Sequence, residues 1–360
     1  MSAGEPGSRG MRAPAVLVER PGEVTLTDVE LGEPGEGDVL IRTLVSGVST
    51  GTDRWVVTGR FEWGAFEFPL VPGYQRIGVV AAIGESVSSL SPGDVVFATS
   101  SRDFVDASAG WGAHAAWAIS PEAEVFPAQG VPALSGSLAV SLQVGVNAAA
   151  RLVDPDGARI LVVGDGIIGT SAALAAQLRG ARVLLAGHRT QRLAAIAASQ
   201  RAAEADLARA GRSTIECINS HEDWASHLAE WQPTSVIDTV QSAAVTSDYL
   251  RFLPCTWNGS ASVHPRHGSS QIVFAGHSPD GITCWADMAG LQQQEATVHF
   301  VSGWTRTRMH NTLELLRNGD LVVDSLISEI ALGDSMTEFL GQLADGSVAP
   351  VAACLRWADD

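Results

Sequence analysis

The chain has 360 residues, a formal net charge of −17 and a hydrophobic share of 46%. That length allows two or three domains, each with its own buried core. The negative charge disfavours nucleic acids and anionic membranes as partners, because both attract basic patches. No apolar run reaches the roughly 18 to 20 residues that span a bilayer, and the N-terminus has no signal-peptide pattern, so we expect a cytoplasmic protein without a membrane partner.

Residue usage sets further limits on the chemistry. A natural-looking start at Met11 suggests that residues 1–10 are a disordered extension. The cysteines form no CxxC pair, which predicts free thiols rather than disulfides or a thiolate zinc site; they are Cys217, Cys255, Cys284 and Cys354. All 23 basic residues are arginine. The lack of lysine excludes Schiff-base catalysis, a Tyr–Lys dehydrogenase pair and a P-loop lysine.

Residues 1–137 are rich in glycine, proline and short β-type runs. Turn sequences such as PGEGD and SPGD separate these runs. The expected strands include Val16–Glu19, Val39–Val45, Ile77–Ile83 and Val95–Ala98. The pattern predicts a twisted, barrel-like β domain.

From residue 138 the apolar residues take up helical spacing, and strands and helices then alternate to about residue 303. The expected strands are Arg159–Val163, Val183–Ala186, Ser235–Val240, Gln271–Ala275 and Thr297–Val301, and the expected helices are Ile167–Leu178 and Arg192–Ala210. Such alternation predicts an α/β domain, with helices on both faces of a doubly wound parallel sheet. Residues 255–270 have the composition of a loop, and residues 304–360 are expected to pack back on the first domain.

A GxGxxG motif lies between the strand RILVV and an alanine-rich helix. Its glycines, Gly164, Gly166 and Gly169, would allow the tight turn, the close approach of a pyrophosphate and the packing of helix on strand. The backbone N–H groups of Ile167 and Ile168 open the helix, where the helix dipole favours phosphate. This context predicts a dinucleotide-binding Rossmann domain.

The end of the following strand, RVLLAG, distinguishes NAD from NADP. NAD-specific domains place an acidic residue there to hold the ribose 2′-hydroxyl. Here that position is Gly187, followed by His188, Arg189, Thr190 and, two positions on, Arg192. Guanidinium groups bind a 2′-phosphate that a carboxylate would repel. The segment therefore predicts NADP(H), unless its arginines only form a solvated helix start.

Four ordered segments resemble the medium-chain dehydrogenase/reductase superfamily: SGVSTGTDRWVVTG, PGYQRIGVVAAIGESVSSLSPGDVV, GAHAAWAI and LLRNGDLVVDSLISEIALGDSMTEF. The resemblance implies a GroES-like catalytic domain over residues 1–137, a Rossmann domain over 138–303, a C-terminal return over 304–360 and a homodimer. Asp53, Gly59 and Phe61 also resemble the D-x5-G-x-aromatic pattern of quinone and enoyl reductases. The first 120 residues resemble the bacteriochlorophyllide hydroxyethyl dehydrogenase group.

Zinc-dependent members of this superfamily hold their catalytic metal with Cys, His and Glu or a second Cys. In this chain the cysteine position falls on Thr50 or Ser49, and the His-Glu pair becomes Tyr74-Gln75. The lobe that carries the structural zinc corresponds to SSRDFVDASAG, which has no cysteine. Because zinc needs thiolate, imidazole or carboxylate ligands, the resemblance implies that neither zinc is bound.

Without a metal, other groups must stabilise or protonate the negative charge that develops on the substrate oxygen. The candidate catalytic residues are Tyr74, Gln75, Thr50, Ser49 and His114. The Tyr74 phenol would donate a proton, or would only pack in the cleft. Gln75 would hold the nicotinamide carboxamide or the substrate, or form part of the wall. His114 would shuttle protons, or would be a structural histidine.

These residues favour a zinc-independent, NADPH-dependent oxidoreductase. Its substrate would be a small hydrophobic metabolite, including those of secondary metabolism, with a polarised C=O, C=C or C=N bond as hydride acceptor. One alternative is an NADP⁺-dependent secondary-alcohol dehydrogenase. Another is a non-catalytic NADPH-binding sensor or scaffold.

Overall fold

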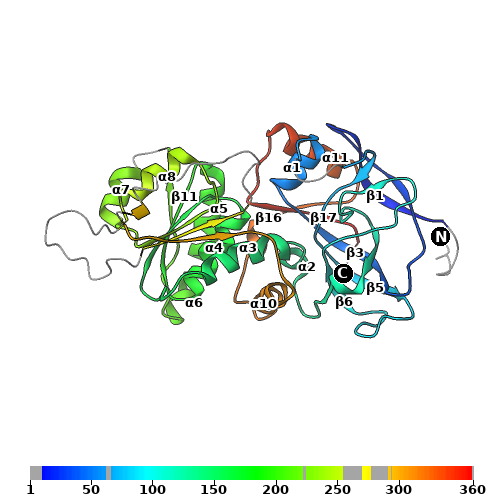
Figure 1. The fold of residues 1–360 in the computed structure, drawn as a ribbon, viewed down its shortest axis with the longest axis horizontal. Helices are drawn as coiled ribbons and strands as arrows, with labels where there is room; N and C mark the ends of the chain where they lie inside the picture. The colour runs from blue at the N-terminus through cyan, green and yellow to red at the C-terminus, as the bar shows by residue number, and fades with distance from the viewer. Residues whose placement is uncertain are drawn as a thin grey trace. The chain divides into compact units, whose positions relative to one another are not determined.

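A computed structural model describes residues 10–61, 66–221, 224–253, 270–276, 291–292 and 294–358 of the chain (Figure 1). The chain divides into two compact units. Unit 1 comprises Met1–Val140 and Met309–Asp360, and unit 2 comprises Ser141–Arg308. Nearly all of the expected N-terminal extension and of the loop 255–270 lies outside the described residues. No helix in the described part of the chain has the length and apolar character to cross a membrane.

Unit 1 is built on two β-sheets. Within the described residues the smaller sheet has the order β2 (Glu23–Leu31), β1 (Met11–Arg20), β4 (Leu70–Val71) and β7 (Ser108–Ala109). The larger has the order β16 (Ile327–Ile330), β17 (Ala352–Arg356), β3 (Asp38–Val48), β5 (Arg76–Ile83), β6 (Val95–Ala98) and β9 (Val125–Pro127), with β8 (Trp117–Pro121) also paired to β3. The described helices and 3-10 helices of unit 1 are α1 (Thr52–Val57), η1 (Glu122–Glu124), α2 (Ala133–Gly136), α10 (Arg306–Arg317, most of it in this unit), η2 (Asp324–Leu326) and α11 (Asp334–Asp345).

The C-terminal segment completes the core of unit 1. Strand β17 pairs antiparallel with β3. The buried side chains of Met336 and Leu340, from α11, pack with Val16 of β1 and Val48 of β3. Apolar burial is the main stabilising contribution in such a core, so residues 309–360 belong to the first folding unit although they follow the second in sequence.

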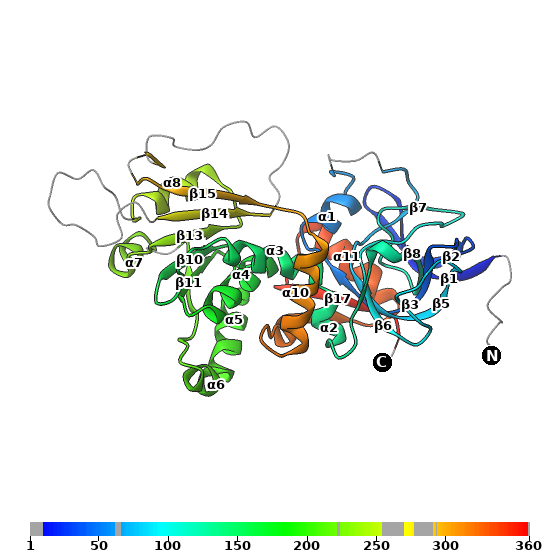
Figure 2. The same ribbon diagram turned by 60° about the horizontal axis from the view of Figure 1, so that its bottom comes forward.

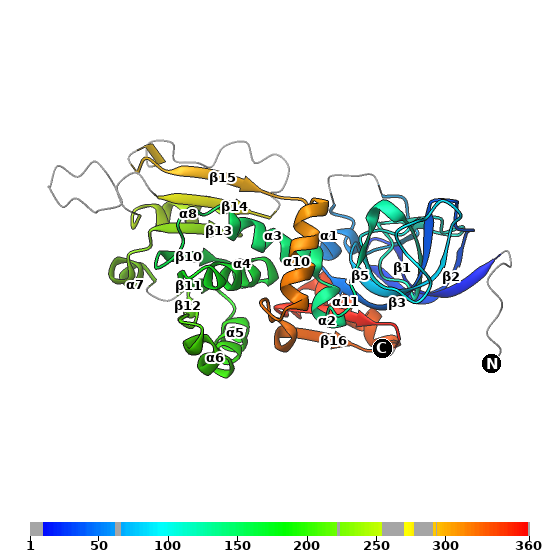
Figure 3. The ribbon, with the colours of Figure 1, turned by 90° about the horizontal axis from the view of Figure 1, so that it is seen from below.

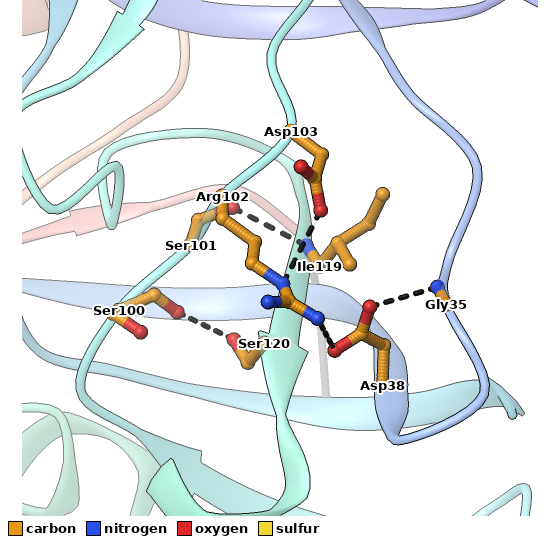
Figure 4. A network of polar contacts seen from close by, with 8 residues as sticks. All are labelled: Gly35, Asp38, Ser100, Ser101, Arg102, Asp103, Ile119 and Ser120. Atoms are coloured by element: carbon orange, nitrogen blue, oxygen red, sulfur yellow. Dashed lines mark hydrogen bonds and ion pairs between the residues drawn. The ribbon is translucent and has the colours of Figure 1, made fainter.

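The segment Ser100–Gly110, which matches the cysteine-free lobe, is held by polar contacts (Figure 4). Asp38 is 1% exposed; its carboxylate pairs with the guanidinium of Arg102 and accepts the Gly35 N–H at 2.7 Å. The Ser101 hydroxyl accepts the Ile119 N–H at 3.2 Å. A buried carboxylate is tolerated because charged and backbone donors satisfy it. These contacts attach the segment to β3 and β8.

Unit 2 contains a parallel sheet of six described strands. Their order is β12 (Glu216–Asn219), β11 (Arg182–Gly187), β10 (Arg159–Val163), β13 (Ser235–Asp238), β14 (Gln271–Ala275) and β15 (Thr297–Val301), as Figure 3 shows. The predicted parallel sheet is confirmed. The expected strand Ser235–Val240 is too long. It ends at Asp238, because that carboxylate accepts the N–H groups of Val240 and Gln241 at 2.8 and 2.9 Å and turns the chain.

Helices cover the sheet of unit 2 on both sides. They are α3 (Ala139–Ala150), α4 (Ile167–Leu178), α5 (Thr190–Ala202), α6 (Glu204–Arg209), α7 (Trp224–Trp231) and α8 (Ala243–Leu250). Figure 1 shows α4 and α6 on the opposite side of the sheet from α7 and α8. The expected single helix Arg192–Ala210 is wrong: α5 begins earlier and the helix is interrupted at Ala203, so that α6 follows as a separate helix (Figure 2).

Candidate functional site

The glycine loop of unit 2 connects β10 to α4 in a form that only glycine permits. Gly164 has a φ of +119°, in the left-handed region. A Cβ on Gly169 would collide with the carbonyl oxygen of Gly164, so the helix can close on the strand only through glycine. At Gly166, which precedes the first residue of α4, a Cβ would meet nothing nearer than the Arg192 guanidinium at 3.7 Å. The loop therefore leaves its backbone accessible at the N-terminus of α4, where Ile167 and Ile168 begin the helix, and it fits a pyrophosphate.

The end of β11 lies against this loop through Asp165, a residue inside the glycine motif. Asp165 is 3% exposed. One carboxylate oxygen accepts the N–H groups of His188 and Arg189 at 2.9 and 2.8 Å, and the other accepts from Arg192 at 3.0 Å. A Cβ on Gly187 would lie 2.5 Å from the Asp165 side chain. The carboxyl end of β11 is thus held by a carboxylate that comes from the loop.

The other residues of this segment are exposed. Arg189 precedes the first residue of α5 and its side chain is exposed, as are those of His188 and Thr190. Arg192 is more enclosed. The pKa of its guanidinium is lowered, mainly by burial. The bond to Asp165 opposes this shift, and the positive charge of Arg189 adds to it. Two guanidinium groups therefore act on each other at the N-terminus of α5, which is an arrangement that favours an anion.

In unit 1, Tyr74 belongs to a group of aromatic side chains, here called the aromatic cluster: Phe61, Phe66, Tyr74 and Trp111. Ring centroids lie 5.1 to 5.3 Å apart among Phe61, Phe66 and Trp111, and the Tyr74 ring meets Trp111 edge-on at 5.6 Å. All four rings are only partly buried. Phe61, Phe66 and Trp111 pack on the buried residues Val18, Val56, Val57 and Leu70. Edge-on contacts of this kind fix ring orientation, so the cluster presents a preformed apolar surface beside the phenol.

His114 is fully buried behind the turn that carries Tyr74. Its Nε2 lies 3.3 Å from the Asp53 carboxylate, and its Nδ1 lies 2.8 Å from the Ser46 hydroxyl. Because a carboxylate accepts, the ring proton belongs on Nε2, and Ser46 donates to Nδ1 while it accepts the indole N–H of Trp357 at 2.8 Å. A Cβ on Gly73 would come within 2.8 Å of this ring. His114 therefore supports the turn from behind and is not itself exposed.

The remaining candidates lie at the ends of β3 and β5. Ser49 and Thr50 follow β3 and are partly exposed, and the Ser49 N–H donates to Asp53 at 2.7 Å. Gln75 is fully buried. Asp53 thus joins Ser49 to His114, so these residues share one network. Among the described residues, no group of three or more His, Cys, Asp or Glu side chains could hold a metal ion.

Arg76, next to Gln75, is a feature that the sequence pattern did not single out. Its side chain is fully buried, and within the described residues none of its three nitrogens has a hydrogen-bond partner. Burial lowers its pKa to about 9. A charge without partners in a protein interior is destabilising.

Comparison with known proteins agrees with this architecture. Residues 35–131 match the alcohol dehydrogenase GroES-like domain. Over 101 residues the chain is 36% identical to 2-desacetyl-2-hydroxyethyl bacteriochlorophyllide A dehydrogenase of Cereibacter sphaeroides, a match that spans 28% of this chain and 31% of that protein. The family match thus concerns residues 35–131, and this chain spans less than a third of the length of that relative.

Solved structures extend the likeness in fold to nearly the whole chain. A structure from Sinorhizobium meliloti 1021 bound to NADP has a TM-score of 0.76 at 18% identity and covers 96% of this chain and 99% of its own. An alcohol dehydrogenase from Escherichia coli CFT073 complexed with NADH has a TM-score of 0.75 at 16% identity, with coverages of 96% and 99%. One of these two structures holds NADP and the other NADH, and at such identities the likeness concerns the fold.

Sequence reasoning missed the two buried carboxylates, Asp53 as a network centre and Asp165. Asp165 could have been noticed as an acidic residue in a loop that binds phosphate. Asp53 lies in the first turn of α1, and its carboxylate accepts the Ser49 N–H at 2.7 Å. Its second partner, His114, lies 61 residues away, and no local pattern reveals such a pairing.

Proposed function

We propose that the chain is an NADP(H)-dependent oxidoreductase that works without catalytic zinc. The observation that carries this proposal is the glycine loop joined to a β11 end that has Gly187 in the acidic position and two arginines after it. The substrate would be a small hydrophobic metabolite with a polarised C=O, C=C or C=N bond. We further propose that the enzyme is cytoplasmic.

The dinucleotide fits the residues of unit 2. The N-terminus of α4 would hold the pyrophosphate, and Arg189 and Arg192 would hold the 2′-phosphate by charge-assisted hydrogen bonds. When bound, the cofactor supplies or accepts the hydride. The chain itself must then bind the substrate, exclude water and manage one proton.

Tyr74 is the residue that we propose manages the proton. Its Oη would donate to the oxygen on which negative charge develops. The edge-on contact with Trp111 and the His114 ring behind Gly73 hold the turn and the phenol in place. The zinc-independent assignment rests on the ligand positions, where Thr50, Tyr74 and Gln75 offer no thiolate, imidazole or carboxylate.

The aromatic cluster supports an apolar substrate. Its rings are partly exposed and lie next to Tyr74, and burial of an apolar substrate against them would contribute roughly 25 cal/mol per Å². The same residues would serve the reverse reaction, oxidation of a secondary alcohol by NADP⁺, with the tyrosine oxygen as the hydrogen-bond partner of the alcohol. A non-catalytic NADPH sensor would use unit 2 alone.

The test is cofactor binding followed by turnover. Titration of the purified chain with NADPH and NADH should show a preference for NADPH of roughly ten- to a hundredfold, since one or two charge-assisted contacts contribute about 1.5–3 kcal/mol each. Equal dissociation constants would refute the NADP(H) assignment. Enzyme-dependent NADPH consumption with a panel of apolar ketones, enones and imines would support catalysis, and NADPH binding without turnover in either direction would favour the sensor.

We also propose a homodimer formed through the edge strand β15. This strand ends the order of the described sheet, and Phe300 on it is 75% exposed while it stacks on Phe274. An exposed aromatic residue on an open edge favours pairing with a second strand. Phe300→Lys should convert a dimer to a monomer in sedimentation, and a wild-type monomer would contradict the proposal.

A further inference from the structure

Asp165 has an environment that a loop residue rarely has. It lies between Gly164 and Gly166, yet its carboxylate is almost fully buried and reaches across to the next strand. It accepts three hydrogen bonds, two from backbone N–H groups and one from a guanidinium. An acidic residue in a loop that binds phosphate would ordinarily oppose anion binding, so the position of Asp165 there needs an explanation.

The three bonds show what the carboxylate does. The two backbone bonds fix the peptide N–H groups of His188 and Arg189, the residues that lead into α5. The third bond holds one guanidinium nitrogen of Arg192, whose side chain is 13% exposed. Arg189 and Arg192 then start from fixed positions, and fixed donors lose less entropy when they bind a ligand.

Once Asp165 is paired with Arg192, the charge that remains near the N-terminus of α5 favours an anion. Asp165 and Arg192 form an ion pair with no net charge. Arg189 adds a second positive charge that acts on Arg192. One positive charge, that of Arg189, therefore remains at the N-terminus of α5.

We infer that Asp165 is the positioning residue of the 2′-phosphate subsite: it orients Arg192 and the His188–Arg189 turn so that NADP(H) is preferred to NAD(H). This inference rests on the proposed cofactor. The acidic side chain that sets the cofactor preference is then Asp165 in the glycine loop, and not a residue at the strand end, where Gly187 lies. In the loop the carboxylate serves the arginines and is not available as a ribose ligand.

Two fragments isolate this subsite from the rest of the cofactor: 2′,5′-ADP and 5′-AMP, which differ by the 2′-phosphate. Asp165→Asn keeps an oxygen for the backbone N–H groups but presents an amide to Arg192. It should lower the affinity for 2′,5′-ADP by about tenfold, as expected for the loss of one charge-assisted alignment, and leave that for 5′-AMP within about threefold. Isothermal titration of the full chain measures both, and NADPH and NADH should follow the same order.

Matched variants separate positioning from folding. Asp206→Asn removes the same charge from an exposed pair with Arg209 in α6 and should change neither affinity. Asp165→Glu should restore part of the preference, since it restores the charge. Equal loss for both fragments in Asp165→Asn would mean that the carboxylate only supports the fold, and tighter 2′,5′-ADP binding would mean that it repels phosphate; either result overturns the inference.

The wild-type measurement distinguishes this inference from the proposed function. If the wild type binds both fragments equally, the NADP(H) assignment fails and the inference fails with it. If the wild type prefers 2′,5′-ADP and Asp165→Asn keeps the full preference, the cofactor assignment stands and the inference alone is wrong.

Discussion

The substitution Gly187→Asp tests how the loop and the strand end share the ribose site. In Rossmann domains an acidic residue at this position holds the ribose 2′-hydroxyl and favours NAD, so the substitution should switch the cofactor if the strand end acted alone. In this chain a Cβ at residue 187 would lie 2.5 Å from both Cβ and Oδ2 of Asp165. We expect the single substitution to fail for that reason.

The magnitude follows from the contacts that Asp165 would lose. Packing a side chain into occupied space costs about 1–3 kcal/mol. If Asp165 moves away, it gives up at least one charge-assisted bond, with a contribution of about 1.5–3 kcal/mol. Gly187→Asp should therefore lower the free energy of unfolding by about 2.5–6 kcal/mol and weaken the binding of both NADPH and NADH.

The assay is urea unfolding together with titration of both cofactors. The double variant Gly187→Asp with Asp165→Gly removes the collision, so it should regain most of the stability and bind NADH more tightly than NADPH. Gly341→Asp is the control, because a Cβ there meets nothing within 4 Å. A Gly187→Asp chain with wild-type stability and a preference for NADH would refute the reasoning.

Three further predictions concern unit 1. If the phenol donates the proton, Tyr74→Phe should lower kcat by about 10²–10⁴-fold and leave NADPH affinity unchanged. As a control, Tyr249→Phe, at the other tyrosine, should change stability and leave kcat intact. A fully active Tyr74→Phe variant would mean that the tyrosine only packs in the cleft. Arg76→Met should raise the free energy of unfolding by about 1–4 kcal/mol, as replacement of a buried charge by an apolar side chain does; a loss of stability in urea would show that the guanidinium has a favourable partner. Elemental analysis should find no stoichiometric zinc, and one chelator-resistant zinc per chain would contradict the ligand argument.

The parallel sheet of unit 2 could be predicted from sequence because periodicity and glycine spacing are local signals. The strands Arg159–Val163, Gln271–Ala275 and Thr297–Val301 were placed with their observed bounds. The helix interruption at Ala203 was not, because alanine favours helix and gives no local signal for a break. In the β domain the four named strands lie within β1, β3, β5 and β6, but strands such as β2 were not named, and the pairing across two sheets depends on distant contacts.

The residues of the candidate site also divide into those that a local sequence pattern predicts and those that only folding brings together. Gly164, Gly166 and Gly169 were found because their roles depend on backbone conformation at fixed spacing. The partners of His114 were not, since Ser46 and Asp53 come from different segments and meet only in the folded chain. Burial also could not be foreseen for Gln75 and His114, which the sequence presented as possible cleft groups and the structure encloses.

Both candidate sites are organised around a buried carboxylate that supports exposed groups. Asp53 accepts from the Ser49 N–H and from His114, and Asp165 accepts from two N–H groups and from Arg192. Such a carboxylate acts on stability and function together, because its removal leaves donors unsatisfied. An exposed group that meets the ligand acts on function with little effect on stability. Measuring unfolding and binding for each variant therefore separates the residues that position a ligand from those that contact it.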